Sequence, residues 1–344
     1  MATFADARLM SFALPLLEEA WDMQGTLRGF PNLGNICFRN AVVQCIFHCE
    51  PLASQLHASS HAPGIVEAAL RNLLEEYLAS GASLADVLSP TGVLHDVSRH
   101  AGFTVGRQED AAECLRQILR YTGLGQMLCD SGADVVDGGV VLCYTPEAAH
   151  VSCAAAAVDA NALLLEATTG DSCLRQAPQA LAIRIENTYE QGGDQFWVDA
   201  KIGWPNAPCT ITIENAARSQ ADYDVQAYLV HRHDQRAPVS AGMRSGHYVA
   251  YFKHANKWYV ADDARAMCLS ESPTEFPYVV FLARSDRGRG GHRNALERRV
   301  QEIQKLRRKA PALARSSGGA ASSSTAGPNK TGKAQDVSGR GVAR

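Results

Sequence analysis

Residues 31–49 read P-N-L-G-N-I-C-F-R-N-A-V-V-Q-C-I-F-H-C, in which a glycine-containing loop is followed by a helical pattern. Apolar residues recur there at spacings of three and four, which predicts a helix with one buried stripe formed by Phe38, Val42, Cys45, Ile46 and Cys49. Asn35 is its predicted N-cap, so Cys37 falls in the first turn. Backbone N–H groups and the positive end of the helix dipole favour a thiolate at that position. Cys37 is therefore a candidate nucleophile; the alternative is that it packs in the core, as cysteines often do.

A second motif lies far downstream, where residues 245–251 read S-G-H-Y-V-A-Y. The alternating pattern predicts a strand that begins at His247, and a short connection leads to a second strand over residues 257–260. In an antiparallel hairpin, the start of the first strand lies opposite the end of the second. We therefore expect His247 to lie beside Asp262, which is the pairing that a histidine base requires. The alternative is a surface histidine and a solvated turn.

The composition of the 344-residue chain is that of an ordinary globular protein, with 46% apolar residues. No run of 18 apolar residues occurs, so no membrane span is predicted. The first residues lack the layout of a signal peptide, and the ten cysteines are irregularly spaced without a C-x-x-C pair. These features predict reduced thiols, a cytoplasmic or nuclear location and no zinc ribbon. We expect neither a metal nor an organic cofactor.

The charge is unevenly distributed along the chain. Residues 286–344 carry 14 basic and 4 acidic residues, so they contribute +10 to a net charge of −3, and residues 1–285 contribute −13. This basic tail is expected to be helical near residues 294–309 and disordered from residue 316. It could bind acidic partners, nucleic acid or membrane lipids, and residues 305–309 could act as a nuclear localisation signal. The alternative is a basic helix that is merely solvated.

The order of the predicted elements indicates an α+β fold. Helical patterns dominate the first part of the chain, over residues 4–24, 37–49 and 63–125. Residues 135–144 are β-prone, and the alanine-rich stretch 153–165 is ambiguous between helix and strand. Strands dominate after residue 180, and we expect them at 181–185, 195–198, 209–213, 223–231, 247–253, 257–260 and 278–283.

Three blocks of sequence resemble one family, the ubiquitin-specific proteases. Residues 32–44, N-L-G-N-I-C-F-R-N-A-V-V-Q, are similar to the family's cysteine box. Residues 246–263, which begin G-H-Y-V-A-Y and end W-Y-V-A-D-D, are similar to its histidine box. Residues 107–119 resemble the helix that the family places between the two boxes. The blocks occur in the family's order, and the resemblance covers about residues 25–285.

The resemblance implies a set of catalytic residues. Cys37 matches the nucleophile, His247 the general base and Asp262 the residue that orients the base, because it follows Trp258 by four positions. Asp263 is a possible substitute for Asp262. Asn32 matches the asparagine whose amide stabilises the oxyanion. The family's chemistry needs neither metal nor organic cofactor.

Three further residues are possible auxiliaries by the same resemblance. Gln108 and Asp110 lie in the intervening helix block, and Tyr248 could help to wall the channel for the Gly-Gly tail of ubiquitin. The departures from the family pattern remove no catalytic group. The larger difference is that residues 130–175 are short and lack the C-x-x-C pairs of the zinc-bearing fingers found in many members.

The implied fold is a papain-like cysteine peptidase hand within residues 25–285. We expect a helical thumb at about 25–130, reduced fingers at about 131–175 and a β-rich palm at about 176–285. Residues 1–24 are expected to form an N-terminal helical extension, and residues 286–344 the basic tail. The implied function is a thiol protease that cleaves after the C-terminal glycine of ubiquitin. The alternatives are a catalytically inactive ubiquitin-binding scaffold and a protease for a ubiquitin-like modifier.

Overall fold

The computed structural model describes the core of the chain and not its ends. The described residues all belong to the first of two compact units, 1–303. They are 27–58, 64–78, 99–100, 102–104, 106–124, 141–144, 157–168, 174, 177–191, 194–198, 200–205, 208–213, 219–233, 239, 242, 245–254 and 256–285. The expected extension at 1–24 and the basic tail at 286–344 lie outside them, as does most of the fingers region.

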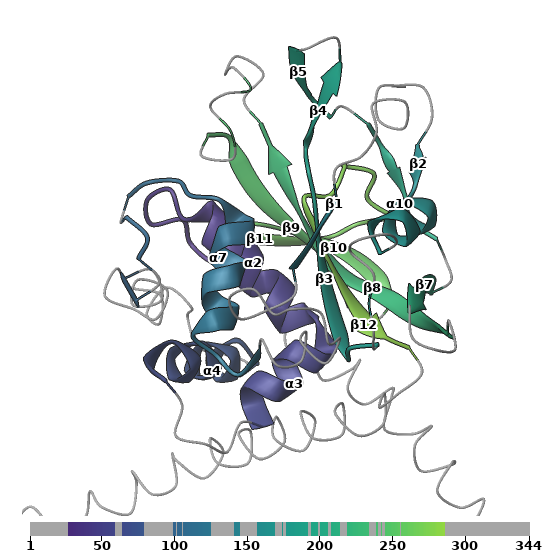
Figure 1. Ribbon diagram of the computed structural model, residues 1–344. Coiled ribbons are helices and arrows are strands. Elements are labelled where there is room, and N and C mark those ends of the chain that lie inside the picture. Colours follow the sequence, from purple (N-terminus) through teal and green to yellow (C-terminus); the bar gives the residue numbers. More distant parts are fainter. Residues whose placement is uncertain are drawn as a thin grey trace, which may run out of the picture. The chain divides into compact units, whose positions relative to one another are not determined.

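A central sheet of eight strands organises the described residues (Figure 1). Seven strands follow the order β1-β3-β12-β8-β9-β10-β11, and β7 pairs with β8 beside this path. Only the β1–β3 pair is parallel among the strand pairs of this sheet. The strands are β1 (Val141–Tyr144), β3 (Ala180–Ile185), β7 (Cys209–Ile213), β8 (Ser219–Arg232), β9 (His247–His254), β10 (Lys257–Asp262), β11 (Arg265–Cys268) and β12 (Val279–Arg284).

Helices accompany the sheet, and four of them lie on one side in Figure 1. These four are α2 (Cys37–His48), α3 (Glu50–Ala58), α4 (Ile65–Leu78) and α7 (Ala111–Arg120). The fifth described helix, α10 (Ala160–Ala167), packs with β7 and β1. Two small two-stranded sheets complete the described elements: β2 (Val158–Asp159) with β6 (Ile202–Gly203), and β4 (Thr188–Gln191) with β5 (Asp194–Trp197). None of the described helices is long and apolar enough to cross a bilayer.

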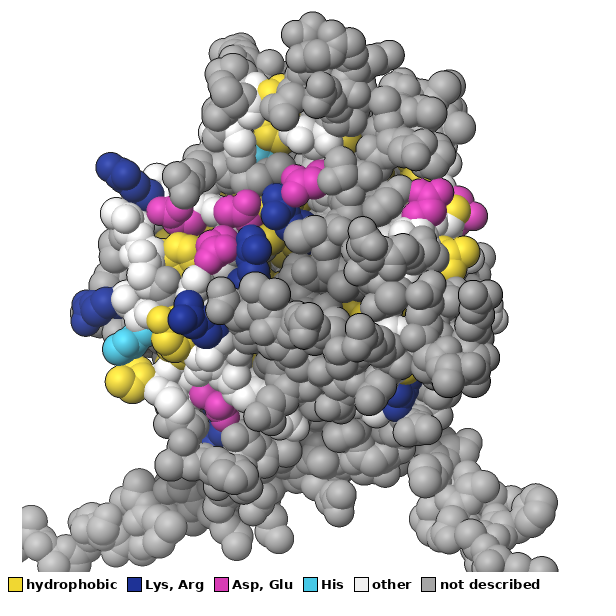
Figure 2. Space-filling view, viewed as in Figure 1, with side chains coloured by type: hydrophobic (Ala, Val, Ile, Leu, Met, Phe, Trp, Pro, Cys, Tyr) yellow, Lys and Arg dark blue, Asp and Glu magenta, His cyan; other side chains and the backbone are white. Residues whose placement is uncertain are grey.

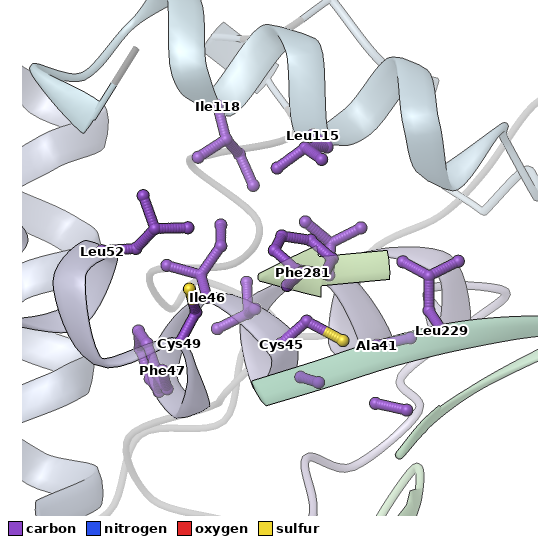
Figure 3. Packing of buried hydrophobic residues seen from close by; sticks show 14 of the residues in the cluster. Ala41, Cys45, Ile46, Phe47, Cys49, Leu52, Leu115, Ile118, Leu229 and Phe281 are labelled. Atoms are coloured by element: carbon purple, nitrogen blue, oxygen red, sulfur yellow. The ribbon is translucent and has the colours of Figure 1, made fainter. Parts of the chain in front are cut away.

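Both faces of the sheet are buried at its central strands, where alternate side chains of a strand enter different hydrophobic clusters. In β12, Val279 and Phe281 join the cluster that contains the helices, whereas Val280 and Leu282 join the second cluster. Figure 3 shows part of the first cluster, where Ile46 of α2 and Leu52 of α3 lie with Ile118 of α7, Leu229 of β8 and Phe281 of β12. Burial on two sides fixes the register of each strand, and with it the positions of residues at the strand ends.

Helix α2 is more deeply buried than its sequence predicts. The pattern predicts one buried stripe, but all 12 residues from Cys37 to His48 are buried. The difference arises because α2 packs between α7 on one side and β8 and β9 on the other. Its polar residues bond within the core: Gln44 Nε2 donates to the Arg28 carbonyl at 2.7 Å, and His48 Nε2 lies 3.0 Å from the Tyr77 hydroxyl.

The predicted α+β class is confirmed, and most predicted strands are found within a few residues of their expected bounds. The ambiguous alanine-rich stretch forms β2 and most of α10. The short strands β4, β6 and β11 were not predicted. Six of the cysteines in the described part of the chain are free thiols: Cys37, Cys45, Cys49, Cys114, Cys209 and Cys268.

Candidate active site

The structure brings the predicted histidine and aspartate together. His247 is the first residue of β9 and Asp262 the last residue of β10. Their side chains form a hydrogen bond of 2.7 Å between His247 Nε2 and Asp262 Oδ1. Ala261 lies opposite Ala250, so Asp262 reaches His247 diagonally across the hairpin, which side chains on neighbouring strands can do.

Cys37 contacts the same histidine from helix α2. It is the first residue of α2, its side chain is buried, and it hydrogen-bonds to His247. The hydrogen bond that the protonated imidazole forms with Cys37 raises the pKa of His247 from 6.5 to about 9; burial opposes this shift, and the bond to Asp262 adds to it. The imidazole therefore lies between the Cys37 sulfur atom and the Asp262 carboxylate, and both partners favour its protonated form. This is the electrostatic environment in which a cysteine–histidine pair is activated.

The start of α2 differs from its prediction. Asn35 is not the N-cap; it has a positive φ of 52°, and its amide donates to the Gly106 carbonyl at 2.9 Å. Ile36 occupies the N-cap position without a side-chain cap bond. Asn32 supplies the missing acceptor instead, since its Oδ1 accepts from the backbone N–H groups of Ile36 at 3.0 Å and Gly34 at 3.3 Å.

Asn32 is also tied to the end of the hairpin. Its Nδ2 donates to Asp263 Oδ2 at 3.0 Å, and Asn40 Nδ2 donates to Asp263 Oδ1 at 2.9 Å. Asp263 therefore links the loop before Cys37 to helix α2. Its Oδ2 lies 4.0 Å from His247 Nε2, compared with 2.7 Å for Asp262, so Asp262 is the direct partner of the histidine.

Three of these side chains also satisfy the distances of a metal site. Ligand atoms of His247, Asp262 and Asp263 lie within 4.8 Å of one another. Their hydrogen bonds to one another and to Asn32 and Asn40 already account for the arrangement.

Two glycines allow the segments of this site to approach closely. A Cβ on Gly29 would lie 1.9 Å from the Asp263 carbonyl oxygen, so no side chain fits where the segment before the cysteine crosses the turn. Gly246 directly precedes His247, has a φ of +102°, and leaves only 2.4 Å between a built Cβ and the Arg232 carbonyl oxygen. Both positions therefore require glycine for steric reasons.

Two of the predicted auxiliary residues, Asp110 and Gln108, lie in different surroundings. Asp110 caps α7, because its Oδ1 accepts from the N–H groups of Ala112 and Glu113, and both of its oxygens bind the Tyr278 hydroxyl. Gln108 lines an open hollow together with Asn35, Gly106, Arg107 and Glu109.

Figure 2 shows acidic and basic side chains mixed on the face of the molecule that carries α7, where Glu113 and Arg116 form an ion pair of 3.2 Å.

Tyr248, the possible wall of the channel, is almost completely buried. It exposes 1% of its surface, and its ring centroid lies 4.7 Å from that of His231. His231 is itself buried, which lowers its pKa from 6.5 to about 4, and its Nε2 lies 2.6 Å from the Ser245 carbonyl oxygen. His231 and Tyr248 pair across β8 and β9, one position further along the strands than the pair of Arg232 and His247.

The sequence pattern missed two charged residues beside the site. Arg232 Nη1 lies 3.4 Å from Asp262 Oδ2, and Arg232 also forms two hydrogen bonds with Glu275. The predicted strand ended at His231, one residue before Arg232. Extending the strand by one residue and pairing it with the next would have placed Arg232 beside His247, as the structure does.

The comparisons with known proteins agree on one family. The family model described as ubiquitin carboxyl-terminal hydrolase matches residues 28–282. Ubiquitin carboxyl-terminal hydrolase 16 of Arabidopsis thaliana is 22% identical over 315 residues, covering 74% of this chain and 30% of the relative. Ubiquitin carboxyl-terminal hydrolase 42 of Homo sapiens is 33% identical over 117 residues, covering 32% of this chain and 8% of the relative. The chain thus spans less than a third of the length of either relative.

Solved structures share the fold. A SAGA Ubp8/Sgf11/Sus1/Sgf73 DUB module bound to ubiquitin aldehyde aligns with a TM-score of 0.54 at 15% identity, covering 76% of this chain and 70% of that chain. A Ubp8-Sgf11-Sgf73-Sus1 SAGA DUB module also aligns at 0.54, with 14% identity, covering 83% of this chain and 76% of that chain. The observed architecture is therefore that of a papain-like peptidase fold.

Proposed function

The chain belongs to the ubiquitin carboxyl-terminal hydrolase family, and from this membership we propose that it is a deubiquitinating thiol peptidase. The substrate bond is the one after the C-terminal glycine of ubiquitin. The observation that carries the proposal is the continuous path of hydrogen bonds from Cys37 through His247 to Asp262. A scaffold that only binds ubiquitin has no need of this path.

The proposed reaction is acyl transfer through a thioester. The thiolate of Cys37 attacks the glycine carbonyl carbon, and the protonated imidazole of His247 gives its proton to the leaving lysine amine. A water molecule then gives one proton to His247, and the hydroxide attacks the thioester carbonyl carbon. The C–S bond breaks, which restores the Cys37 thiolate beside protonated His247, and ubiquitin leaves as a carboxylic acid that loses its proton to solvent. Asp262 keeps the imidazole oriented through both steps.

The proposed oxyanion site lies at the start of α2. The amide nitrogen of Asn32 carries two hydrogens, and the bond to Asp263 uses one of them. The other can donate to the negative oxygen that forms during the attack, together with the backbone N–H of Cys37 at the helix start. Because Asn32 Oδ1 also accepts from Ile36, the amide is held at both ends and cannot rotate freely.

Ubiquitin is the proposed substrate because the family model and one aligned structure, which is bound to ubiquitin aldehyde, agree on it. The short stretch expected for the fingers leaves a ubiquitin-like modifier as the main competing substrate. The catalytic residues would be the same for both, so the substrate must be decided by measurement.

The test compares fluorogenic amides of ubiquitin and of ubiquitin-like modifiers side by side, with Cys37→Ala as the control. We expect the full chain to release the fluorophore from ubiquitin, and Cys37→Ala to release none. A clear preference for another modifier would overturn the substrate assignment. Absence of cleavage of every modifier would favour the inactive scaffold.

A further inference from the structure

Arg232 occupies an unusual place beside the catalytic group. It is the last residue of β8 and pairs in register with His247, the first residue of β9. Its guanidinium donates to Glu275 through Nε at 2.9 Å and Nη2 at 2.7 Å, and through Nη1 to Asp262 Oδ2 at 3.4 Å. Tyr251 completes the cluster, since its hydroxyl donates to Glu275 Oε1 at 2.8 Å and accepts from Arg232 Nη2 at 3.2 Å.

We propose that Arg232 is a positioning residue for the carboxylate of Asp262, and that Glu275 holds Arg232 in place and balances its charge. The inference rests on the proposed function, because it assigns Asp262 to the catalytic group. It assigns no direct contact between Arg232 and substrate.

The geometric argument starts from the two oxygens of Asp262. Oδ1 binds His247 and Oδ2 binds Arg232, so one planar carboxylate is held by two cationic groups on different strands. Rotation of the carboxylate would weaken both bonds. The guanidinium is rigid and planar, and its two parallel bonds to Glu275 fix the plane from which Nη1 reaches Asp262. A lysine at this position would keep the positive charge but could not form the two parallel hydrogen bonds of the guanidinium.

The electrostatic argument concerns how one carboxylate is shared. Arg232 is always charged, so it competes with protonated His247 for Asp262. Glu275 counteracts this competition by drawing the guanidinium toward itself. Burial alone would raise the pKa of Glu275, but the hydrogen bonds from Arg232 and Tyr251 lower it below its ordinary value, so Glu275 is a full counter-charge.

The charged and titratable groups that face His247 come from three elements. Cys37 approaches from α2, Asp262 and Asp263 from the end of β10 and the turn after it, and His231 and Arg232 from the end of β8. Replacing Arg232 by methionine removes a positive charge and leaves Glu275 uncompensated, so the pKa of His247 should rise. Replacing Glu275 by glutamine releases the charge of Arg232 toward Asp262, so the pKa of His247 should fall.

The experiment is an NMR titration of the His247 imidazole in full-length protein labelled at histidine, with His247→Ala identifying the resonance. The variants are Arg232→Met, Arg232→Lys and Glu275→Gln. Arg71→Met is the matched control, because Arg71 forms a comparable ion pair of 3.1 Å with Glu67 on α4. The titration at low ionic strength should show opposite displacements of at least about half a pH unit for Arg232→Met and Glu275→Gln, and none for the control.

A second readout separates charge from geometry. Arg232→Lys should leave the titration near that of the wild type but lower kcat/KM on the ubiquitin amide, because the carboxylate is less well fixed. Arg232→Met should lower kcat/KM by about tenfold, the order of loss expected for a small misplacement of a catalytic group. Arg71→Met should keep the wild-type rate.

Equal titration of His247 in Arg232→Met, Glu275→Gln and Arg71→Met would overturn the inference. If Arg232→Met does not fold, the comparison of Glu275→Gln with Arg232→Lys carries the same test. The titration needs no substrate, so it gives a result even if the chain cleaves no ubiquitin. Opposite shifts in an inactive protein would support the positioning role and contradict the proposed function.

Discussion

The side chain of Asn32 donates a 3.0 Å hydrogen bond to Asp263, a residue 231 positions further along the chain. The bond joins the proposed oxyanion donor to the turn that follows strand β10. Asp263 holds a positive φ of 46°, and Asn40 of helix α2 binds its other oxygen. The two neighbouring aspartates therefore have different partners: Asp262 binds His247, and Asp263 binds Asn32 and Asn40, so under the proposed mechanism Asp262 orients the histidine and Asp263 fixes the oxyanion site.

This division of tasks predicts distinct losses for the two aspartates. Asp262→Ala leaves His247 without its partner, so kcat should fall by about a hundredfold or more, by analogy with the loss of an orienting carboxylate. Asp263→Ala only loosens Asn32, and kcat should fall by about tenfold, whereas Asn32→Ala should cost about 10²- to 10³-fold. Steady-state kinetics on a ubiquitin amide gives these values. A larger loss for Asp263→Ala than for Asp262→Ala would contradict the assignment.

Activity should persist into alkaline solution and then decline. The bond with Cys37 raises the pKa of His247 to about 9, so the imidazole keeps the proton that the leaving amine needs until the pH exceeds that value. Because the pKa of His247 is higher in the folded than in the unfolded chain, the stabilisation of the fold by protonated His247 is complete below about pH 6.5 and is lost as the pH rises through about 9. The basic limb of kcat/KM against pH reports this group. A basic limb that falls near pH 6.5 would contradict the pairing.

Acid should destabilise the fold through two buried histidines. Burial lowers the pKa of His231 to about 4 and that of His48 well below its ordinary value. Below about pH 6.5 the unfolded chain binds protons that the folded chain does not, so stability is complete above that pH and declines as the pH falls toward 4. Each group contributes a slope of about 1 kcal/mol per pH unit in this window. Urea unfolding at several pH values measures the slope.

The substitution His48→Phe supplies the control for that measurement. His48 stacks on Phe252 with ring centroids 3.6 Å apart, so an aromatic ring fits the site. His48→Phe should reduce the slope between pH 6.5 and 4 even if it changes the stability at neutral pH through the lost bond to Tyr77. An unchanged slope would show that His48 is not responsible.

Gly246, which precedes His247, should resist substitution. Gly246→Ala meets both the positive φ of +102° and a carbonyl oxygen 2.4 Å away, so it should destabilise the protein by at least about 2 kcal/mol and lower kcat/KM. Gly102→Ala is the matched control, because Gly102 has a φ of +76° with nothing within 4 Å and should lose only about 1 kcal/mol. Equal losses in urea unfolding would rule out the steric role of Gly246.

The sequence predicts the fold class and the proximity of His247 and Asp262, because strand alternation and hairpin length depend on local residues. It does not predict the N-cap of α2, because Asn32 reaches the Ile36 N–H from outside the usual capping position. Nor does it predict the full burial of α2, since Gln44 and His48 are polar and find partners far away in the sequence. The bond between Arg232 and Glu275 spans 43 positions and depends on the strand order of the sheet, which no local pattern encodes.

The central claim is that Cys37 is the nucleophile toward the C-terminus of ubiquitin. Intact-mass spectrometry of the native full chain after exposure to ubiquitin with a C-terminal electrophile tests it most directly, with Cys37→Ala alongside. We predict the addition of one ubiquitin to the native chain, mapped by peptide analysis to Cys37, and no addition to Cys37→Ala. No adduct with the native chain, or an adduct that persists in Cys37→Ala, would contradict the account.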